Sequence, residues 1–173
     1  MDSSTPRTRV TAAACVLIAV AAVSGCGAGQ LSQTAAMEPA VNGSMATLNN
    51  IALRNIRIRA KQTSYAVRPG MAVDLALVAA NQSPDTADAL VAVTSEVGAV
   101  TVVGNTAIPA GGILIVDNPD RVDAGALAAV KPANIATATV ILTKAISSGL
   151  TYEFTFQFRR VGEVSVRVPV SAG

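Results

Sequence analysis

Residues 150–158, with the sequence LTYEFTFQF, alternate strictly between apolar and polar side chains. A period of two residues is that of a β-strand, whose successive side chains point to opposite faces. One face carries four of the five aromatic residues of the chain, namely Tyr152, Phe154, Phe156 and Phe158. We interpret this aromatic ridge as the core face of a central strand, and the alternative is a surface on which a ligand stacks. The fold must therefore be built around β-strands.

Further strand patterns follow one another along the chain, and no long helical pattern separates them. They fall at residues 55–61, 71–80, 89–104 (two strands broken near 96–98), 113–116, 134–144 and 162–170. The strands at 134–144 and 150–160 are expected to pair around a Ser-Ser-Gly turn, and residues 123–130 to form a helical turn or a loop. Short strands at this spacing predict an all-β fold, an antiparallel β-sandwich of cupredoxin-like or immunoglobulin-like type.

The N-terminus has the organisation of a bacterial lipoprotein signal. Arg7 and Arg9 precede an uncharged apolar run over residues 10–23. This run is shorter than the roughly 20 apolar residues that a membrane-spanning helix needs. The sequence Val-Ser-Gly-Cys at 23–26 then matches the lipobox, an aliphatic residue and two small ones before a cysteine. We predict that Cys26 receives an S-diacylglyceryl group and, once freed as the N-terminus, an N-acyl chain. The alternative is an ordinary signal peptide with a chance cysteine.

Three segments follow from this assignment: a signal peptide over 1–25, a lipidated flexible tether over 26–44, and a β-sandwich domain over 45–173. Two or more acyl chains give stable membrane anchoring where a single one is marginal. The expected location is the outer face of the cytoplasmic membrane, with membrane lipid contacted through the covalent anchor.

Composition excludes several classes of chemistry. The chain contains no histidine, and its two cysteines are Cys15, inside the signal, and Cys26. Catalytic triads that need histidine, His-based metal sites and disulfides are therefore excluded from the mature protein. Cleavage after residue 25 leaves 11 Lys and Arg against 10 Asp and Glu, a balance that argues against nucleic acid as a partner. Carboxylate-pair and Ser-Lys chemistries are left open by this composition, but the three lysines and ten acids of the mature chain are scattered and no nucleophile motif such as G-x-S-x-G is present. We therefore expect no enzymatic activity and no cofactor.

Two acidic clusters have the oxygen ligands that calcium prefers. Asp117, Asp120 and Asp123 are spaced three residues apart, and Asp85 and Asp88 form a second group. Neither spacing matches the EF-hand loop, and such sequences are common in turns, so the turn interpretation is preferred.

A basic stripe lies on the polar face of the first long strand pattern. Arg57, Arg59 and Lys61 alternate with apolar residues, and Arg54 precedes them. The stripe is either a solvated strand face or a surface that meets anionic lipid headgroups near the anchor.

The chain resembles the LpqE-type lipoproteins of mycobacteria in the blocks SGCGAGQLSQTA, PAVNG, NQSPD, LTYEFTFQF and VPVSAG. Residues 72–170 are more distantly similar to the periplasmic copper chaperone (PCuAC) family, whose fold is cupredoxin-like. That family binds Cu(I) through a histidine near the position of Val102 or Val103 and a later His-x-Met near 121–123. Neither place has such a ligand here, so the resemblance implies the fold without the copper site.

These observations predict a membrane-anchored envelope lipoprotein that presents a non-catalytic binding or scaffolding domain to an envelope protein partner. One alternative is a copper-handling or metal-handling chaperone of the PCuAC type with non-standard ligands. A second alternative is a carrier of an apolar envelope molecule.

Replacing Cys26 with Ala removes the thiol that would carry the diacylglyceryl group. We expect the variant to lose lipidation and its signal peptide to be removed more slowly. In detergent phase separation we expect less of the variant than of wild type in the detergent phase. Cys15→Ala is the matched control, because Cys15 lies inside the apolar run, and it is expected to partition like wild type. Detergent-phase partitioning of Cys26→Ala equal to that of wild type contradicts the lipobox assignment.

Overall fold

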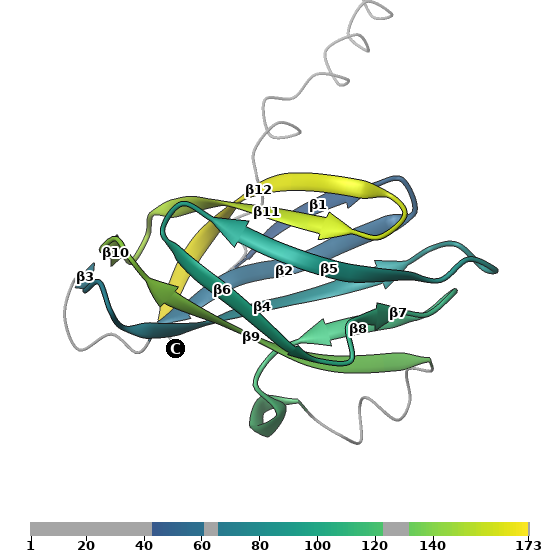
Figure 1. Ribbon diagram of the computed structural model, residues 1–173, viewed down its shortest axis with the longest axis horizontal. Helices are drawn as coiled ribbons and strands as arrows, with labels where there is room; N and C mark the ends of the chain where they lie inside the picture. The colour runs from purple at the N-terminus through teal and green to yellow at the C-terminus, as the bar shows by residue number, and fades with distance from the viewer. Residues whose placement is uncertain (1–42, 61–65, 123–131, 173) are drawn as a thin grey trace, which may run out of the picture. The chain divides into compact units, whose positions relative to one another are not determined.

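The computed structural model describes residues 43–60, 66–122 and 132–172 (Figure 1). Cys26, the signal, nearly all of the predicted tether and the segment 123–130 lie outside the described residues. The elements are β1 (Ser44–Leu48), β2 (Ile51–Ala60), β3 (Ala66–Val67), β4 (Ala72–Asn81), β5 (Asp88–Ser95), β6 (Gly98–Gly104), β7 (Ala107–Ile108), β8 (Ile113–Val116), the 3-10 turn η2 (Pro119–Arg121), β9 (Ala133–Leu142), β10 (Ile146–Ser147), β11 (Thr151–Phe158) and β12 (Gly162–Ala172). No helix in these ranges is long and apolar enough to cross a membrane.

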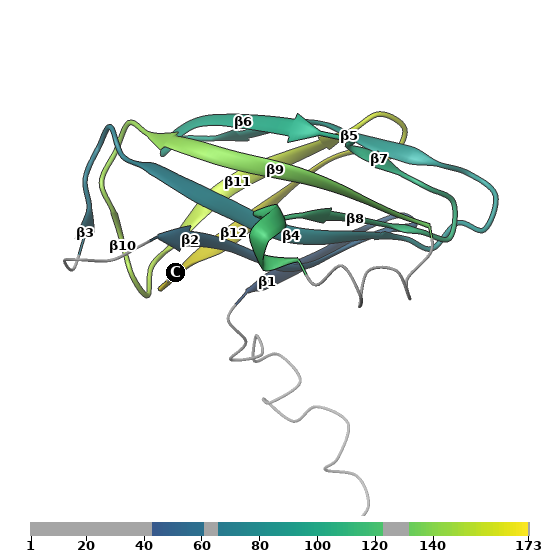
Figure 2. The same cartoon turned by 90° about the horizontal axis from the view of Figure 1, so that it is seen from below.

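The main strands belong to one sheet with the order β1-β2-β12-β11-β5-β6-β9-β4-β8, and β2 also pairs with β4. This last pairing closes the sheet on itself around a single interior (Figures 1 and 2). The all-β prediction is confirmed. The prediction of an antiparallel sandwich needs correction, because the strands form one closed sheet and β12–β2 and β8–β9 are parallel pairs.

The β2–β4 pairing, which closes the sheet, is much more extensive than the β5–β6 pairing. β2 and β4 pair from Ile51 opposite Asn81 to Arg59 opposite Asp74, with one irregularity on the way. β5 and β6 pair only where Ser95 meets Gly98 and then diverge. A Cβ on Gly98 would lie 2.3 Å from the carbonyl oxygen of Ile141, so this tight corner needs glycine.

The aromatic ridge of β11 is the centre of the core, as predicted. Phe154 and Phe156 are fully buried and Phe158 is 3% exposed, whereas Tyr152 is half-buried and its hydroxyl accepts a 2.9 Å hydrogen bond from the backbone N–H of Ser147. Across the ladder, the inward side chains of β12 are valines, and Val166 lies opposite Phe154. The ridge is thus packed against protein and is not available as a stacking surface.

The expected pairing of the strands on either side of the Ser-Ser-Gly turn is wrong. β11 pairs with β12 and β5, whereas β9 pairs with β6, β4 and β8. The short strand β10 lies between them and pairs with β3. The segment between β9 and β11 therefore crosses from one part of the closed sheet to another instead of forming a hairpin turn.

Two polar side chains are buried among the described residues, and each joins loops to the sheet. Asn81, at the end of β4, donates to the carbonyl of Thr86 (2.7 Å) and accepts from the side chain of Asn50 (2.7 Å). Asp88, at the start of β5, accepts from the backbone N–H groups of Arg160 (3.0 Å) and Val161 (3.2 Å) in the β11–β12 turn. Both side chains have the partners that a buried polar group requires.

Truncating Phe156 to Ala removes a fully buried ring and leaves a cavity. We expect the free energy of unfolding to fall by about 3–5 kcal/mol and the melting temperature by roughly 10 °C or more. Gln157→Ala, on the exposed face of the same strand, is the control and should change stability by about 0.5 kcal/mol or less. Thermal unfolding of the two variants decides between core and surface, and an unchanged melting curve for Phe156→Ala excludes the core assignment.

The two carboxylate oxygens of Asp88 accept hydrogen bonds from backbone N–H groups. In the Asp88→Asn variant an amide NH₂ group, which is a donor, replaces one of these oxygens. Leaving such a buried donor without an acceptor costs about 1–3 kcal/mol, so we expect a loss of stability in that range. Asp85→Asn, at an exposed position of the neighbouring loop, serves as the comparison and is expected to cost less. Equal denaturation midpoints for the two variants would show that Asp88 does not hold the β11–β12 turn.

Candidate functional site: an arginine-lined hollow at the end of β2

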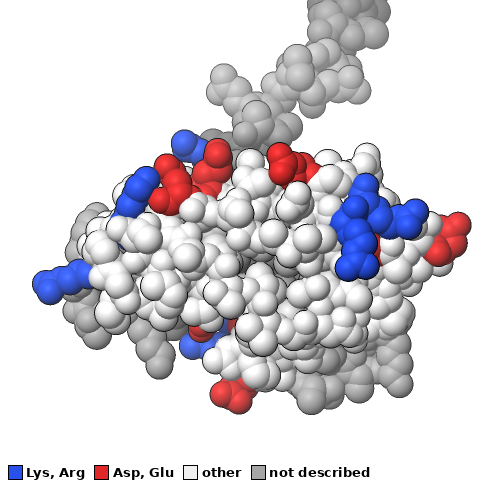
Figure 3. Space-filling model, viewed as in Figure 1, with Lys and Arg blue, Asp and Glu red and all other residues white. Residues whose placement is uncertain are grey.

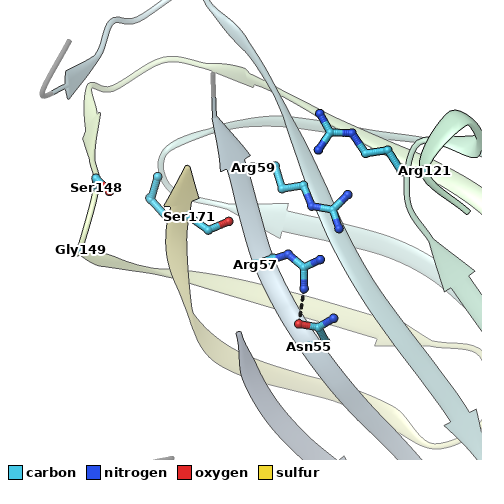
Figure 4. A pocket seen from close by; sticks show the side chains of 8 residues that line it. Asn55, Arg57, Arg59, Arg121, Ser148, Gly149 and Ser171 are labelled. Atoms are coloured by element: carbon cyan, nitrogen blue, oxygen red, sulfur yellow. Dashed lines mark hydrogen bonds between the residues drawn. The ribbon is translucent and has the colours of Figure 1, made fainter. Parts of the chain in front are cut away.

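Three arginine side chains line a hollow at the C-terminal end of β2 (Figure 4). The hollow has a volume of about 860 Å³, within the size range of small-molecule sites. It is lined by Asn55, Arg57, Arg59, Arg121, Ser148, Gly149, Val170 and Ser171. We call it the arginine hollow. Its lining comes from β2, η2, the β10–β11 connection and β12, so only the folded chain assembles it.

A bulge in β2 determines which arginines reach the arginine hollow. The β2–β4 register shifts between Arg54 and Arg57, and Asn55 takes a positive φ of 55° at this point. Beyond the bulge the strand alternates regularly, with Ile56 and Ile58 fully buried and Arg57 and Arg59 on the outer face. Arg57 also donates to the side chain of Asn55.

The predicted basic stripe is therefore divided. Arg54, before the bulge, folds back toward β1 and donates to the carbonyl oxygens of Ala46 (3.1 Å) and Leu53 (2.8 Å). Lys61 lies outside the described residues. Two members of the stripe, Arg57 and Arg59, remain together in the arginine hollow.

Arg59 is held by an ion pair with Asp117, in which nitrogen and oxygen are 2.5 Å apart. The two side chains are 13% and 14% exposed, so the pair is largely shielded from water. Asp117 also accepts from the backbone N–H of Asn118 (2.7 Å). This arrangement fixes the guanidinium of Arg59 and neutralises one of the positive charges of the arginine hollow.

The pKa of Arg57 responds to its burial and to the charged groups around it. Its pKa is lowered from the ordinary value, first by partial burial, then by the charges of Arg59 and Arg121, while Asp117 acts in the opposite direction. The group stays protonated at neutral pH, because an arginine pKa is far above that range. Burial is thus the largest cause of the lowered pKa, and the charges of Arg59 and Arg121 act in the same direction.

Arg121 reaches the site from η2, 62 positions along the chain from Arg59. The turn is capped by Asn118, whose side chain accepts from the backbone N–H of Asp120 (3.0 Å), and Pro119 begins it. The strand pattern of β2 does not connect Arg121 with the basic stripe. No local pattern contains that information, because the contact depends on the pairing of β4 with both β2 and β8.

The carboxylates that the sequence offers as calcium ligands, with turns as the preferred interpretation, have other roles in the described structure. Asp117 is paired with Arg59, Asp120 is exposed in η2, and Asp123 lies outside the described residues. Asp88 holds the β11–β12 turn, and hydrogen bonds from the hydroxyls of Ser83 and Thr86 lower the pKa of Asp85. The described ranges contain no group of three or more His, Cys, Asp or Glu side chains that could hold a metal ion.

The positions at which the PCuAC resemblance would place copper ligands carry none here. Val102 is half-buried and Val103 is 62% exposed, both on β6, and Arg121 lines the arginine hollow. The methionines of the described ranges are Met45, on β1, and Met71, just before β4, and both are exposed.

An uncharged face covers β6 and β9. Neither strand contains a charged residue, and the exposed side chains of β6 include Ala99, Thr101 and Val103. Ile141, opposite Ala99 on β9, is 45% exposed. Figure 3 shows this face as a broad surface without charge, with Lys, Arg, Asp and Glu at its margins.

The fold is similar to that of solved PCuAC domains. A copper-bound PCuAC domain from PmoF2 matches with a TM-score of 0.54 at 18% identity, over 75% of this chain and 99% of that domain. An apo PCuAC domain from PmoF1 matches with a TM-score of 0.56 at 17% identity, over 75% of this chain and 100% of that domain. At this level of identity the likeness shows a shared fold.

The sequence relatives are LpqE proteins of mycobacteria. LpqE of Mycobacterium tuberculosis strain H37Rv is 55% identical over 163 residues, which cover 92% of this chain and 87% of that protein. LpqE of Mycobacterium leprae is 48% identical over 171 residues, covering 96% of this chain and 90% of that protein. The family model described as "Putative lipoprotein LpqE-like" matches residues 51–170, which include β2 to β11, most of β12 and seven of the eight residues that line the arginine hollow. This chain belongs to the LpqE-like family of lipoproteins.

Proposed function

We propose that this chain is an envelope lipoprotein, held through Cys26 on the outer face of the cytoplasmic membrane, whose PCuAC-like domain is a non-catalytic binding module. The lipobox at 23–26 and the lipoprotein names of the relatives support the anchor. The domain presents a charged hollow and an uncharged strand face, which are surfaces suited to binding.

The observation that carries the proposal is the chemistry at the positions where the copper family has its ligands. Soft donors such as methionine sulfur and cysteine thiolate select Cu(I), and imidazole also suits copper. Valine methyl groups and a guanidinium occupy those positions instead. The domain thus keeps the copper-chaperone scaffold while its side chains serve a different binding role.

The packing of the interior argues against a carrier of apolar molecules. The phenylalanines of the β11 ridge belong to one core cluster with Leu53, Leu75 and Leu114, which are 0–1% exposed. The arginine hollow and a smaller hollow beside Thr94 and Glu153 are lined chiefly by polar and charged residues. An apolar guest would need an apolar cavity, so surface recognition is the better-supported role.

Titration with Cu(I) in the presence of a competing chelator tests this proposal against the metal-handling alternative. We expect binding no tighter than adventitious, and no change when Met45 and Met71 are both replaced with Leu. A PCuAC domain that binds copper is the positive control. A stoichiometric site of sub-nanomolar affinity that the Met45→Leu, Met71→Leu variant weakens would instead establish a copper role with non-standard ligands.

A further inference from the structure

The arginine hollow has the donors of an anion site. Arg57, Arg59 and Arg121 bring three guanidinium groups to one side of β2 (Figure 4), and Asn55 and Ser148 add neutral polar groups. Among the described residues a single carboxylate, that of Asp117, pairs with any of the three arginines. Two positive charges therefore remain without a counter-charge in this part of the structure.

Guanidinium groups suit phosphate in particular. The planar fork of arginine donates two parallel hydrogen bonds to phosphate oxygens, and it is more weakly hydrated than the lysine ammonium. The arginine hollow contains no described lysine, and Arg59 is already oriented by its ion pair. The side chains that remain to meet a ligand are Arg57, from the strand, and Arg121, from the turn opposite.

The arginine hollow also lies where the chain from the predicted anchor enters the domain. Gly43 is in direct contact with Asn55, since a Cβ on Gly43 would be 2.9 Å from the side-chain oxygen of Asn55. Residue 43 follows Cys26 by 17 positions. Seventeen residues span at most about 55–60 Å even when fully extended, so anchoring at Cys26 would keep this side of the domain within that distance of the membrane.

We propose that the arginine hollow binds the phosphate group of an anionic phospholipid headgroup, with Arg57 and Arg121 as the ligand-contacting residues and Arg59 held in place by Asp117. Anchoring at Cys26 would hold the domain within reach of the lipids of the cytoplasmic membrane, whose headgroups carry this phosphate. Only the choice of a lipid as the source of the phosphate rests on the proposed anchoring at Cys26. Phosphate binding itself rests on the arginine side chains. Binding of this kind orients the domain, so that its β2 end faces the lipid.

The test uses the full lipidated chain in uncharged maltoside micelles, titrated calorimetrically with dihexanoyl phosphatidylglycerol. Parallel titrations use dihexanoyl phosphatidylcholine and inorganic phosphate, and these distinguish an anionic headgroup from a zwitterionic one and from a soluble ion. We expect phosphatidylglycerol to bind more tightly than either, with an affinity that falls as salt is raised.

The decisive variant combines Arg57→Gln with Arg121→Gln. We expect its affinity for phosphatidylglycerol to fall at least tenfold, since each removed charge near an anionic surface weakens binding severalfold. The matched control combines Arg159→Gln with Arg160→Gln, two exposed arginines in the turn at the opposite end of β12, and should stay within about twofold of wild type. Melting curves of both variants establish that each is folded.

Equal affinity of the Arg57, Arg121 variant and wild type for phosphatidylglycerol overturns the proposal. Equal binding of phosphatidylcholine by wild type, or binding of inorganic phosphate as tight as that of phosphatidylglycerol, overturns the assignment to an anionic headgroup. Failure of the anchor is recognised separately, because the mass of the acylated N-terminus reports lipidation at Cys26 whatever the arginine hollow binds.

Discussion

The pairing of β2 with β4 is the interaction on which the rest of the structure depends. It closes the sheet, and it encloses the phenylalanine ridge of β11 between strands that are far apart in the sequence. Residues 43–173 contain no cysteine, so no disulfide can hold this closure. Burial of apolar side chains and the backbone ladder must supply the stability, with Asn81 and Asp88 tying the loops at the strand ends.

The same closure places the arginine hollow. Because β4 pairs with β2 along one edge and with β8 along the other, the turn that follows β8 comes to lie beside the end of β2. Arg121 and Asp117 thereby join Arg57 and Arg59 in one hollow. The bulge at Asn55 completes the arrangement, since it separates Arg54 from the other two arginines of β2.

Local periodicity predicted the strands well where alternation is strict. The alternation over residues 150–158 predicts the core strand β11, and the strand predicted at 113–116 coincides with β8. Pairing was less predictable: the expected hairpin of β9 and β11 does not exist, and the closure that replaces a two-sheet sandwich involves long-range pairs. A period of two says which face is buried, but it does not say which neighbour a strand chooses. For the same reason the sequence predicts only part of the arginine hollow. Arg57 and Arg59 lie on one strand, so their proximity follows from local alternation. Arg121 joins them only through the pairing of distant strands.

Charge is unevenly distributed over the domain, with the arginine hollow at the end where the chain from the predicted anchor enters and an uncharged face over β6 and β9. The strands that carry these two surfaces belong to one closed sheet, so we expect them to unfold together. Native-state hydrogen exchange tests this most directly. If β2–β4 closure unites the sheet, the slowest amides of β2, β4, β9 and β11 exchange with one common free energy, that of global unfolding. Exchange of β4 and β9 at a distinctly lower free energy than β11 would show two independently opening sheets and contradict the closed fold.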